Sequence, residues 1–432
     1  MKKRREQRES KKKVEERVQL TSSSSTIQHA LHNCRNSSVD RISDLPDELL
    51  IYILSFLPTK LAFTTAILSK RWTQLCYSLP IIDLSYKTIT KCRTLKRFRC
   101  FVNNIMLSPV STNKPMKIFR FKCLLRYHQR NSKFNVTKWL EAAKQRHIEE
   151  IHLSLPSHTL MPDLFVSQTL VVLKLESLYV GKGTSCVHLP SLKTLNLTSV
   201  YFQNWNNYVN FLYACPILED LYAEPIHFIR FDENNASEEG IKSLTLSKLV
   251  RASIRIRDGV VNGINNVKFL RVLICAKAFS LNAIPLFENL ISMELVFPRC
   301  SYICWDDVVE LLRHCPKLQI LFIEKRWLNS SSKEWKCPIS VLECVSSHLR
   351  SCTTLNIDCT IDDIRLANDI RFAKYILQNA GILQDMTIGI TSNITKIFQS
   401  KIREELSSYP RISRGCKLSF ELKYNRDGDL WY

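Results

Sequence analysis

The sequence contains unusually little glycine. It has nine glycines in 432 residues, where average usage would give about thirty. None precedes Gly181, and neither GxxxxGK[ST] nor GxGxxG occurs. Nucleotide-binding loops need glycines where the backbone approaches phosphate closely. The scarcity of glycine therefore excludes Walker-type ATPases and dinucleotide-binding folds.

Catalytic and metal-binding motifs are also missing. The ten histidines form no HExxH, no GxSxG occurs, and the closest cysteines, Cys300 and Cys304, are a CxxxC pair with no second pair. Zinc sites of the finger or RING type need four ligands in paired spacings. Acidic residues are scattered, without a nucleophile in a recognisable context. The sequence therefore predicts a protein that is not an enzyme and that has no catalytic residues, no metal site and no cofactor.

Long apolar runs are absent as well. The longest, LLIYILSFL, is too short to cross a bilayer. The opening MKKRREQRESKKK is charged and lacks the apolar region of a secretory signal. Sixteen cysteines fall below the density of disulfide-rich scaffolds. We expect a protein of the nucleus and/or cytoplasm, without a membrane partner and with reduced thiols.

Positive charge is in excess and is unevenly distributed. The formal net charge is +21. Residues 1–20 contribute +5, from nine Lys/Arg and four Glu, and residues 86–150 contribute +13, from sixteen Lys/Arg and three Glu. Such an excess suits anionic partners, namely nucleic acid, acidic protein or phosphorylated segments. Within the second stretch, Lys96, Arg97 and Arg99 alternate with Phe98 and Phe101, for which we expect buried packing rather than nucleic-acid stacking.

The hydrophobic content of 45% predicts a globular core for most of the chain. Residues 1–38, charged and then Ser-rich, are interpreted as a flexible tail that could carry an import signal. Residues 39–80 predict two helices. The first follows Leu45-Pro46, with Asp44 as cap, and ends before Pro58. The second covers 61–79. Two helices this short cannot bury both faces alone, so one face should serve a partner.

A repeat begins at residue 116. Its pattern, apolar-xx-apolar-x-apolar, predicts one strand per repeat, at spacings close to the about 20–29 residues of leucine-rich repeats. We expect helices between the strands, for example over 136–146 and 305–315. The matches are Met116/Phe119/Phe121, Ile148/Ile151/Leu153, Leu170/Leu173/Leu175, Leu192/Leu195/Leu197, Leu218/Leu221/Ala223, Ile241/Leu244/Leu246, Phe269/Val272/Ile274, Leu290/Met293/Leu295 and Leu318/Leu321/Ile323.

Beyond Pro338 the spacing lengthens. Cys352/Leu355/Ile357 and Leu383/Met386/Ile388 predict two further strands, with a helix between them that ends at Gly381. A last helix and the alternating strand CKLSFEL follow. We expect this α+β end piece to close the open edge of the repeat array.

Two segments resemble known plant domains. VDRISDLPDELLIYILSFLPTKLAFTTAILSKRW, with its LPDELL, ILSFLPTK and LSKRW elements, closely resembles the F-box of plant F-box proteins. It departs from that pattern at Leu61, where an acidic residue is usual, and at Cys76, where a tryptophan is usual. The segments CVSSHLRSCTTLNI, FAKYILQNAGILQDMTI and KIREELSSYPRISRGCKLSFE resemble the FBD domain of plant F-box/leucine-rich-repeat proteins.

Together with the repeat and with the tails, which lie outside it, the resemblance implies an α/β protein in five parts. These are a tail (1–38), an F-box (39–85), a leucine-rich-repeat solenoid with a basic leading segment (86–337), an FBD domain (338–424) and a C-terminal tail (425–432). It also implies that the F-box binds a Skp-type adaptor and, through it, a cullin ubiquitin ligase. The adaptor-facing positions would be Leu45, Pro46, Leu49, Leu50, Ile53, Leu54, Leu57, Pro58, Leu68 and Trp72.

The expected function is therefore the substrate-recognition subunit of a Skp-cullin-F-box ligase. It would hold an unidentified protein client for ubiquitination by proximity. The alternative is a basic repeat scaffold that binds nucleic acid, or acidic or phosphorylated protein, without client turnover; nucleic acid is the less favoured partner. For the client, we expect the strand residues that lie between the last two apolar positions, together with the basic helix: Lys174, Asn196, Tyr222, Thr245, Glu294, Phe322, Lys96, Arg97 and Arg99.

Overall fold

The structure, a computed structural model, describes residues 42, 44–85, 95–112, 114–123, 135–156, 158–229, 246–255, 263–274, 284–298, 305–325, 334–357, 363–391 and 395–423. The predicted tails lie outside this set. The chain divides into two units, 1–56 and 57–432. In the first, helix α2 spans Asp47–Ser55, and Asp47 and Glu48 lie in its first turn, where they complement the helix dipole. Pro46 is the N-cap and no side chain caps the helix, so the expectation that Asp44 is the cap is wrong.

The second unit opens with three short helical turns where the sequence predicts one helix. Helix α3 spans Thr59–Thr64, a 3-10 turn η1 spans Thr65–Ile67, and helix α4 spans Lys70–Tyr77. The break falls at Ser69, whose backbone is extended and whose side chain accepts a hydrogen bond from the Trp72 amide. Serine is a strong N-cap and a weak interior helix residue, so it starts a new helix here.

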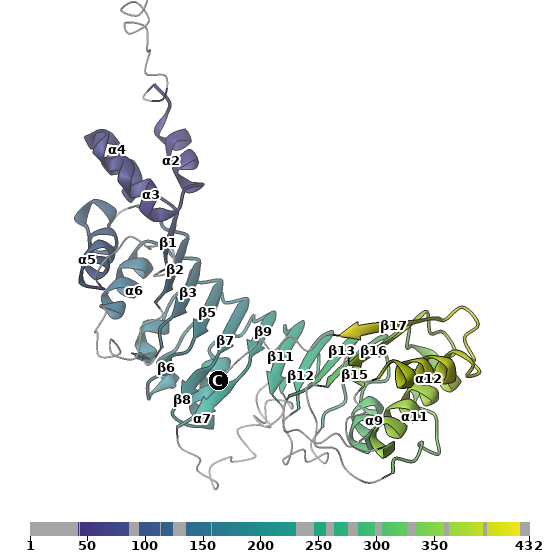
Figure 1. The fold of residues 1–432 in the computed structure, drawn as a ribbon. Coiled ribbons are helices and arrows are strands. Elements are labelled where there is room, and N and C mark those ends of the chain that lie inside the picture. The colour runs from purple at the N-terminus through teal and green to yellow at the C-terminus, as the bar shows by residue number, and fades with distance from the viewer. Residues whose placement is uncertain are drawn as a thin grey trace, which may run out of the picture. The chain divides into compact units, whose positions relative to one another are not determined.

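Thirteen parallel strands follow, hydrogen-bonded side by side in chain order (Figure 1). Strictly parallel neighbours require a crossover between consecutive strands, and the intervening helices and loops supply it. The strands are β1 (Ile81–Ser85), β2 (Ile118–Lys122), β3 (Glu150–Ser154), β5 (Val172–Glu176), β7 (Thr194–Thr198), β9 (Asp220–Ala223), β11 (Arg251–Arg255), β12 (Phe269–Leu273), β13 (Ser292–Phe297), β14 (Ile320–Lys325), β15 (Ser351–Ile357), β16 (Asp385–Thr391) and β17 (Lys417–Lys423).

The two faces of this sheet differ in burial. Along β2, β5 and β7, buried and half-buried residues alternate. The buried positions are the apolar pairs of the repeat, such as Leu173 and Leu175 on β5, and each such side chain stabilises the fold by about 1.5–3 kcal/mol. Helices cover this face: Phe98 and Trp139 both pack on the ring of Phe121 from β2. We call the other face, which carries the half-buried residues, the open face.

The helices of the second unit lie between the strands in sequence. The expected helices over 136–146 and 305–315 are confirmed as α6 and α9, and the helix that precedes Gly381 is confirmed as α11. The bounds are α5 (Leu95–Met106), α6 (Val136–Gln145), α7 (Trp205–Tyr213), α9 (Trp305–Arg313), α10 (Glu343–Ser347), α11 (Asp363–Asn379) and α12 (Lys396–Ser407). Three further 3-10 turns are η2 (Pro109–Ser111), η4 (Pro162–Phe165) and η5 (Thr184–Cys186).

Most predicted repeats have the expected register, but three do not. The sixth was placed at Ile241/Leu244/Leu246, whereas the strand is Arg251–Arg255, with Ala252 and Ile254 buried. On β12 the buried pair is Leu270 and Val272, whereas the repeat pattern predicts Val272 and Ile274. On β15 the inward pair is Cys352 and Thr354, because a register shift follows Thr354.

Strand β1 and a small second sheet were not predicted. The second sheet has the order β10-β8-β6-β4. Its members are β4 (Thr159–Leu160), β6 (Tyr179–Val180), β8 (Val200–Phe202) and β10 (Ile226–Phe228). Strands of two or three residues are too short to show a period.

The C-terminal segment continues the main sheet. Strands β15, β16 and β17 pair in parallel register with β14 and with one another. The expected α+β end piece is present, and its strands extend the main sheet, with β17 as the last strand in the described part of the chain. Helices α11 and α12 connect these strands.

Candidate functional site

The predicted adaptor-facing residues of the first unit fall into two groups. Leu49 and Ile53 are about half exposed, Pro46 is exposed and Leu45 is half-buried. Leu50 and Leu54 are at most 1% exposed, so their side chains offer no surface in this structure. Sequence reasoning missed Tyr52 and Phe56, which are 62% and 69% exposed and lie edge to face at 4.8 Å. Their aromatic character and spacing of four were the available signal.

The second unit contributes the remaining predicted adaptor positions. Leu57, Pro58 and Leu68 are exposed, whereas Trp72 is only 9% exposed on α4. Ile67, beside Leu68, is 89% exposed and was not predicted. Cys76 is fully buried, and its Sγ donates to the Ala62 carbonyl at 3.1 Å. The cysteine that stands in place of the usual tryptophan is therefore part of the α3–α4 contact.

A single row of thirteen residues follows the middle of the open face, one from each strand. We call it the central row. Five of the six predicted client residues from the strands belong to it, whereas Thr245 lies outside the described residues and Ser253 takes the corresponding place. In register order the row is Asp83, Arg120, His152, Lys174, Asn196, Tyr222, Ser253, Arg271, Glu294, Phe322, Thr353, Thr387 and Ser419.

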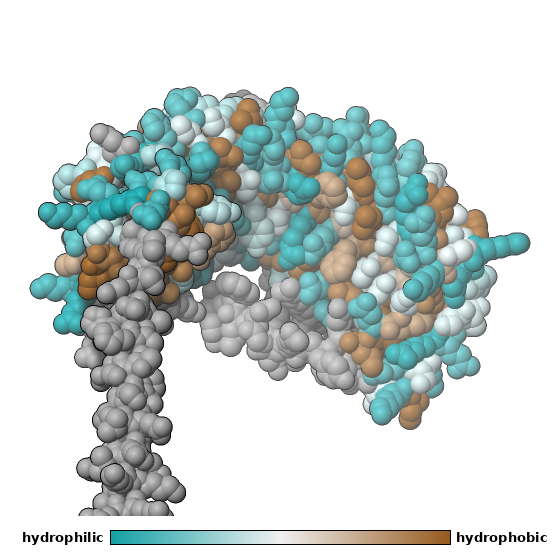
Figure 2. Space-filling model, turned by 90° about the horizontal axis from the view of Figure 1, so that it is seen from above, coloured by the Kyte–Doolittle hydropathy of each residue, from teal (hydrophilic) through white to brown (hydrophobic). Residues whose placement is uncertain are grey.

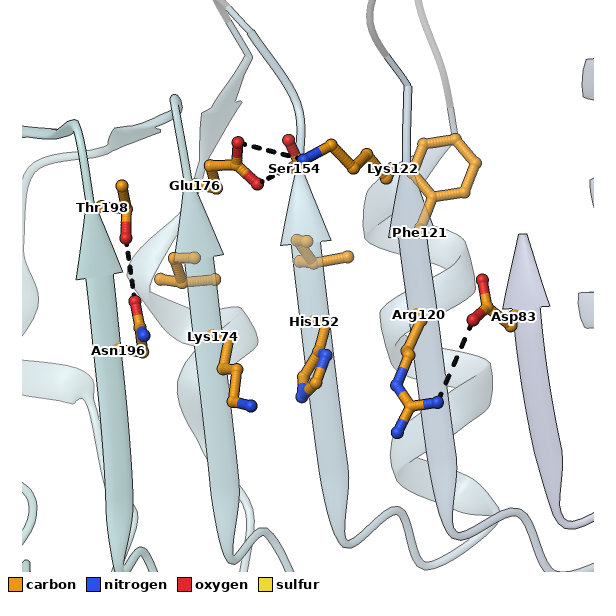
Figure 3. A pocket seen from close by; sticks show the side chains of 12 residues that line it. Asp83, Arg120, Phe121, Lys122, His152, Ser154, Lys174, Glu176, Asn196 and Thr198 are labelled. Carbon is orange, nitrogen blue, oxygen red and sulfur yellow. Dashed lines mark hydrogen bonds and ion pairs between the residues drawn. The ribbon is translucent and has the colours of Figure 1, made fainter. Parts of the chain in front are cut away.

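The N-terminal end of the open face contains a pocket of about 470 Å³ (Figure 3). Two of its cations, Arg120 and Lys122, lie beside carboxylates. Arg120 donates from Nη2 to Glu150 Oε1 at 2.9 Å, and its Nη1 lies 4.0 Å from Asp83. Lys122 Nζ lies 3.1 Å from Glu176 Oε2. The lining residues are Asp83, Arg120, Phe121, Lys122, His152, Leu153, Ser154, Lys174, Leu175, Glu176, Asn196 and Thr198.

His152 occupies the centre of this pocket. Burial, together with the positive charge of Lys174 on the next strand, lowers its pKa to about 4 against the opposing effect of Glu150. The imidazole is therefore neutral at pH 7. Its Nε2 lies 3.0 Å from Glu150 Oε1 but makes no hydrogen bond there.

A second polar cluster lies in the middle of the sheet. Glu224 is 5% exposed; its Oε1 accepts a hydrogen bond from the Ser253 hydroxyl and lies 3.6 Å from Arg271 Nε. Arg271 also donates to Glu294. Burial raises the pKa of Glu224, and burial also raises the pKa of Tyr222. Two predicted client residues, Tyr222 and Glu294, are thus tied to a partly buried ion network.

The basic helix α5 does not share the open face. Its Phe98 is fully buried and stacks on Phe121, a residue of the helix-covered face. Lys96 and Arg97 are exposed on this helix, whereas Arg99 is half-buried. The expectation of buried packing holds for Phe98, but the structure separates Lys96, Arg97 and Arg99 from Lys174 and Asn196. The basic residues that do reach the open face are Arg120 and Lys122.

Most cysteines that the structure describes are part of the core. Cys76, Cys123, Cys215, Cys315, Cys344, Cys352 and Cys416 are buried, and burial raises the pKa of Cys123 and Cys352 to about 12. Thiols in this state are unreactive. Among the described residues, no group of three His, Cys, Asp or Glu side chains could hold a metal ion. No helix in the same part of the chain is long and apolar enough to cross a membrane.

The surface alternates in polarity. Figure 2 shows hydrophilic and hydrophobic side chains interspersed on the face in view, with the hydrophobic ones in separate small patches. Such a mixture is found on protein surfaces in general and does not distinguish an interface.

Comparison with known families and proteins agrees with these features. A family model described as an F-box domain matches residues 42–84, and one described as FBD matches residues 336–388. The chain combines an F-box with an FBD. The F-box match covers α2, α3, α4 and most of β1, and the FBD match covers α10, α11, β15 and the start of β16.

Plant relatives match over most of the chain. Two F-box/FBD/LRR-repeat proteins of Arabidopsis thaliana are each 26% identical, over 88% and 89% of this chain and over 94% and 100% of their own lengths. An FBD-associated F-box protein of the same plant is 27% identical over 89% of this chain and 98% of its own length. The order of F-box, sheet and FBD in this chain is consistent with plant F-box/LRR proteins that carry a C-terminal FBD.

Proposed function

We propose that this chain is the substrate-recognition subunit of a Skp-cullin-F-box ubiquitin ligase. The F-box binds a Skp-type adaptor, the adaptor carries the chain to the cullin, and the open face of the sheet holds a protein client. The chain itself is non-catalytic. A client lysine reaches the charged E2 at high effective concentration because both are held in one assembly.

The observation that carries this proposal is the F-box match together with the exposed apolar side chains in it. Leu49 and Ile53 are about half exposed on α2, one helical turn apart, and Leu57 and Leu68 are exposed in the second unit. Exposure of large aliphatic side chains to water is unfavourable in free energy. Burial against a partner would stabilise a complex by about 1.5–3 kcal/mol for each side chain that becomes fully covered.

The client-binding part of the proposal rests on the parallel sheet, which we interpret as a leucine-rich-repeat solenoid. Each repeat contributes one strand whose apolar pair faces the helices, while its central-row residue faces outward. In a solenoid, such outward positions are not needed for the core, so they are free to specify a partner. Tyr222 and Phe322 supply aromatic contact, and the neighbouring Arg271 and Glu294 supply charge.

The charge pattern on the open face favours a protein over a nucleic acid. Arg120, Lys122 and Arg271 each pair with a carboxylate. A nucleic-acid groove needs cations that are free to neutralise phosphates and so displace the counterions of the nucleic acid, whereas this face offers both signs. The basic scaffold that binds nucleic acid therefore remains the less favoured alternative. Affinity for single-stranded nucleic acid that falls steeply with salt would support it.

Reconstitution tests the proposed function directly. The full chain is co-expressed with a Skp-type adaptor, and the complex is added to a cullin, its RING subunit, E1, E2 and ubiquitin. We expect a one-to-one complex with the adaptor, and ubiquitin transfer to proteins trapped by the chain when the ligase is inhibited. No adaptor complex would contradict the F-box assignment, and an adaptor complex without any ubiquitinated client would reduce the chain to a scaffold.

A further inference from the structure

The open-face pocket around His152 contains one cation without a counter-ion. Lys174 extends from β5 into the pocket between His152 and Asn196 (Figure 3). Its ammonium makes no ion pair or hydrogen bond in the described part of the chain, whereas the other two pocket cations, Arg120 and Lys122, lie against carboxylates. Three cations and three carboxylates thus surround the pocket, and Lys174 is the cation that no described carboxylate contacts.

Two polar atoms of the same pocket also lack hydrogen-bond partners among the described residues. The Ser154 hydroxyl lines the same pocket, its side chain is 96% buried, and it makes no hydrogen bond. His152 Nε2 is buried and unbonded in the same way. Buried polar groups without partners are costly in a folded protein. Both belong to β3 and line the pocket that Lys174 enters, which indicates a place where a ligand completes the bonding.

The hydrogen-bond donors beside Lys174 are suited to a planar anion such as a carboxylate. Thr198 donates to Asn196 Oδ1 at 2.9 Å, which leaves the Asn196 amide nitrogen to donate beside the Lys174 ammonium. The neutral imidazole of His152 can donate one further proton on the other side of Lys174. Hydrogen bonds from an ammonium to a carboxylate are stronger than neutral ones.

We propose that this pocket binds the carboxylate of an acidic side chain in the client peptide, between Lys174 and Asn196. This inference rests on the proposed function, because it places the client on the open face. A carboxylate carries one charge and can pair with Lys174, the pocket cation that no described carboxylate contacts. A phosphate group carries about −1.5 to −2, and would meet Asp83, Glu150 and Glu176 around the pocket without enough free cations.

The test uses an array of random decapeptides, each made in three versions that have glutamate, glutamine or phosphoserine at one central position. The probe is the full chain in complex with its adaptor. On the peptides that bind, we expect glutamate versions to exceed glutamine versions by about tenfold, the factor of one charge-assisted hydrogen bond. In Lys174→Met the preference should fall below about twofold, and Lys174→Arg should retain it.

The matched control is Lys138→Met, which removes an exposed lysine from α6 on the helix-covered side. It should keep the glutamate preference. An unchanged preference in Lys174→Met, no glutamate preference in the wild type, or a stronger Lys174-dependent preference for phosphoserine would each overturn the proposal. Adaptor binding and client ubiquitination are measured on the same variants. Normal ubiquitination with no glutamate preference would reject the pocket and leave the proposed function standing.

Discussion

Lys325 and Asp369 form a buried ion pair between strand β14 and helix α11. Their side chains are 5% and 9% exposed, and the Lys325 ammonium lies 5.8 Å from the centre of the Trp305 ring. Asp369 belongs to the segment that matches the FBD, and Lys325 belongs to the strand just before it. The ring of Trp305 in turn stacks on Phe372 of α11 at 4.1 Å. The FBD is thus fixed to the preceding sheet by charge as well as by strand pairing.

Loss of one partner of this pair should destabilise the chain strongly. We expect Lys325→Met to lower the free energy of unfolding by about 3–5 kcal/mol, because the substitution removes one partner of a buried ion pair. Urea denaturation, followed by circular dichroism, measures the change. The double variant Lys325→Met/Asp369→Leu is the control. It should recover most of the loss, since an apolar pair of similar volume needs no desolvation. A double variant as unstable as the single one would show that packing, and not charge, is responsible.

A double substitution in helix α2 tests the adaptor interface. Leu49→Ala/Ile53→Ala removes two half-exposed aliphatic side chains and leaves the buried Leu50 and Leu54 in place. We expect the affinity for a Skp-type adaptor to fall by at least about tenfold, with little change in the unfolding midpoint. Isothermal titration with purified adaptor measures the affinity. The control is Ile339→Ala, a fully exposed isoleucine outside the F-box match, which should bind normally.

Leu45 and Pro46 provide an independent check on the same interface. Pro46 is exposed and Leu45 is half-buried, so Leu45→Ala/Pro46→Ala changes the surface where α2 begins. We expect co-purification with the adaptor to weaken by at least about tenfold, since each buried aliphatic side chain contributes about 1.5–3 kcal/mol. Full adaptor binding by a folded variant would remove these two residues from the interface.

His152 should make the stability of the second unit depend on pH. Its pKa is about 4 in the folded chain and about 6.5 when unfolded, so the unfolded chain binds the proton more readily. The stabilising contribution is complete above pH 6.5 and is lost as the pH falls toward 4. The charged groups that face the ring are Arg120, Lys174 and Glu150. His152→Gln should therefore flatten the fall in unfolding midpoint between pH 6.5 and 4. A fall of unchanged size would assign it to other groups.

The repeat could be predicted because its apolar positions are the ones that pack on the helices. Leu173 and Leu175 had to be buried for β5 to exist, and the residue between them, Lys174, then had to face outward. The same reasoning places Asn196, Tyr222, Glu294 and Phe322 correctly in the central row.

The failures have equally specific causes. The segment VKFLRVLI contains overlapping apolar triplets, so the pattern could not choose between Leu270/Val272 and Val272/Ile274 on β12. Near β11, the distance in sequence from Ala223 to the next buried pair, Ala252 and Ile254, exceeds the usual repeat length. The expected spacing therefore favoured the earlier triplet Ile241/Leu244/Leu246 over one that contains the weakly apolar Ala252. The pocket was missed because its polar residues come from strands whose register must be known first. A lysine without a counter-ion, such as Lys174, becomes visible only after its neighbours have been paired.

The central row makes a final prediction about the client. Tyr222 and Phe322 are half-buried on the open face and are not part of the core that packs on the helices. Tyr222→Ala/Phe322→Ala should therefore cost only on the order of 0.5 kcal/mol of stability for each site, and adaptor affinity should be unchanged. Client capture by the ligase-inhibited complex, quantified by mass spectrometry, should fall severalfold, because aromatic side chains contribute strongly to protein interfaces.

The matched control for this variant is Tyr213→Ala/Phe398→Ala, which removes the same two residue types from helices α7 and α12, where they are 43% and 42% exposed. It should capture clients at the wild-type level. If Tyr222→Ala/Phe322→Ala also captures every client, the binding surface is not the part of the central row around Tyr222 and Phe322. Because the FBD strands continue the same sheet, the next place to search is the open face of β15, β16 and β17, where Thr353, Thr387 and Ser419 extend the row.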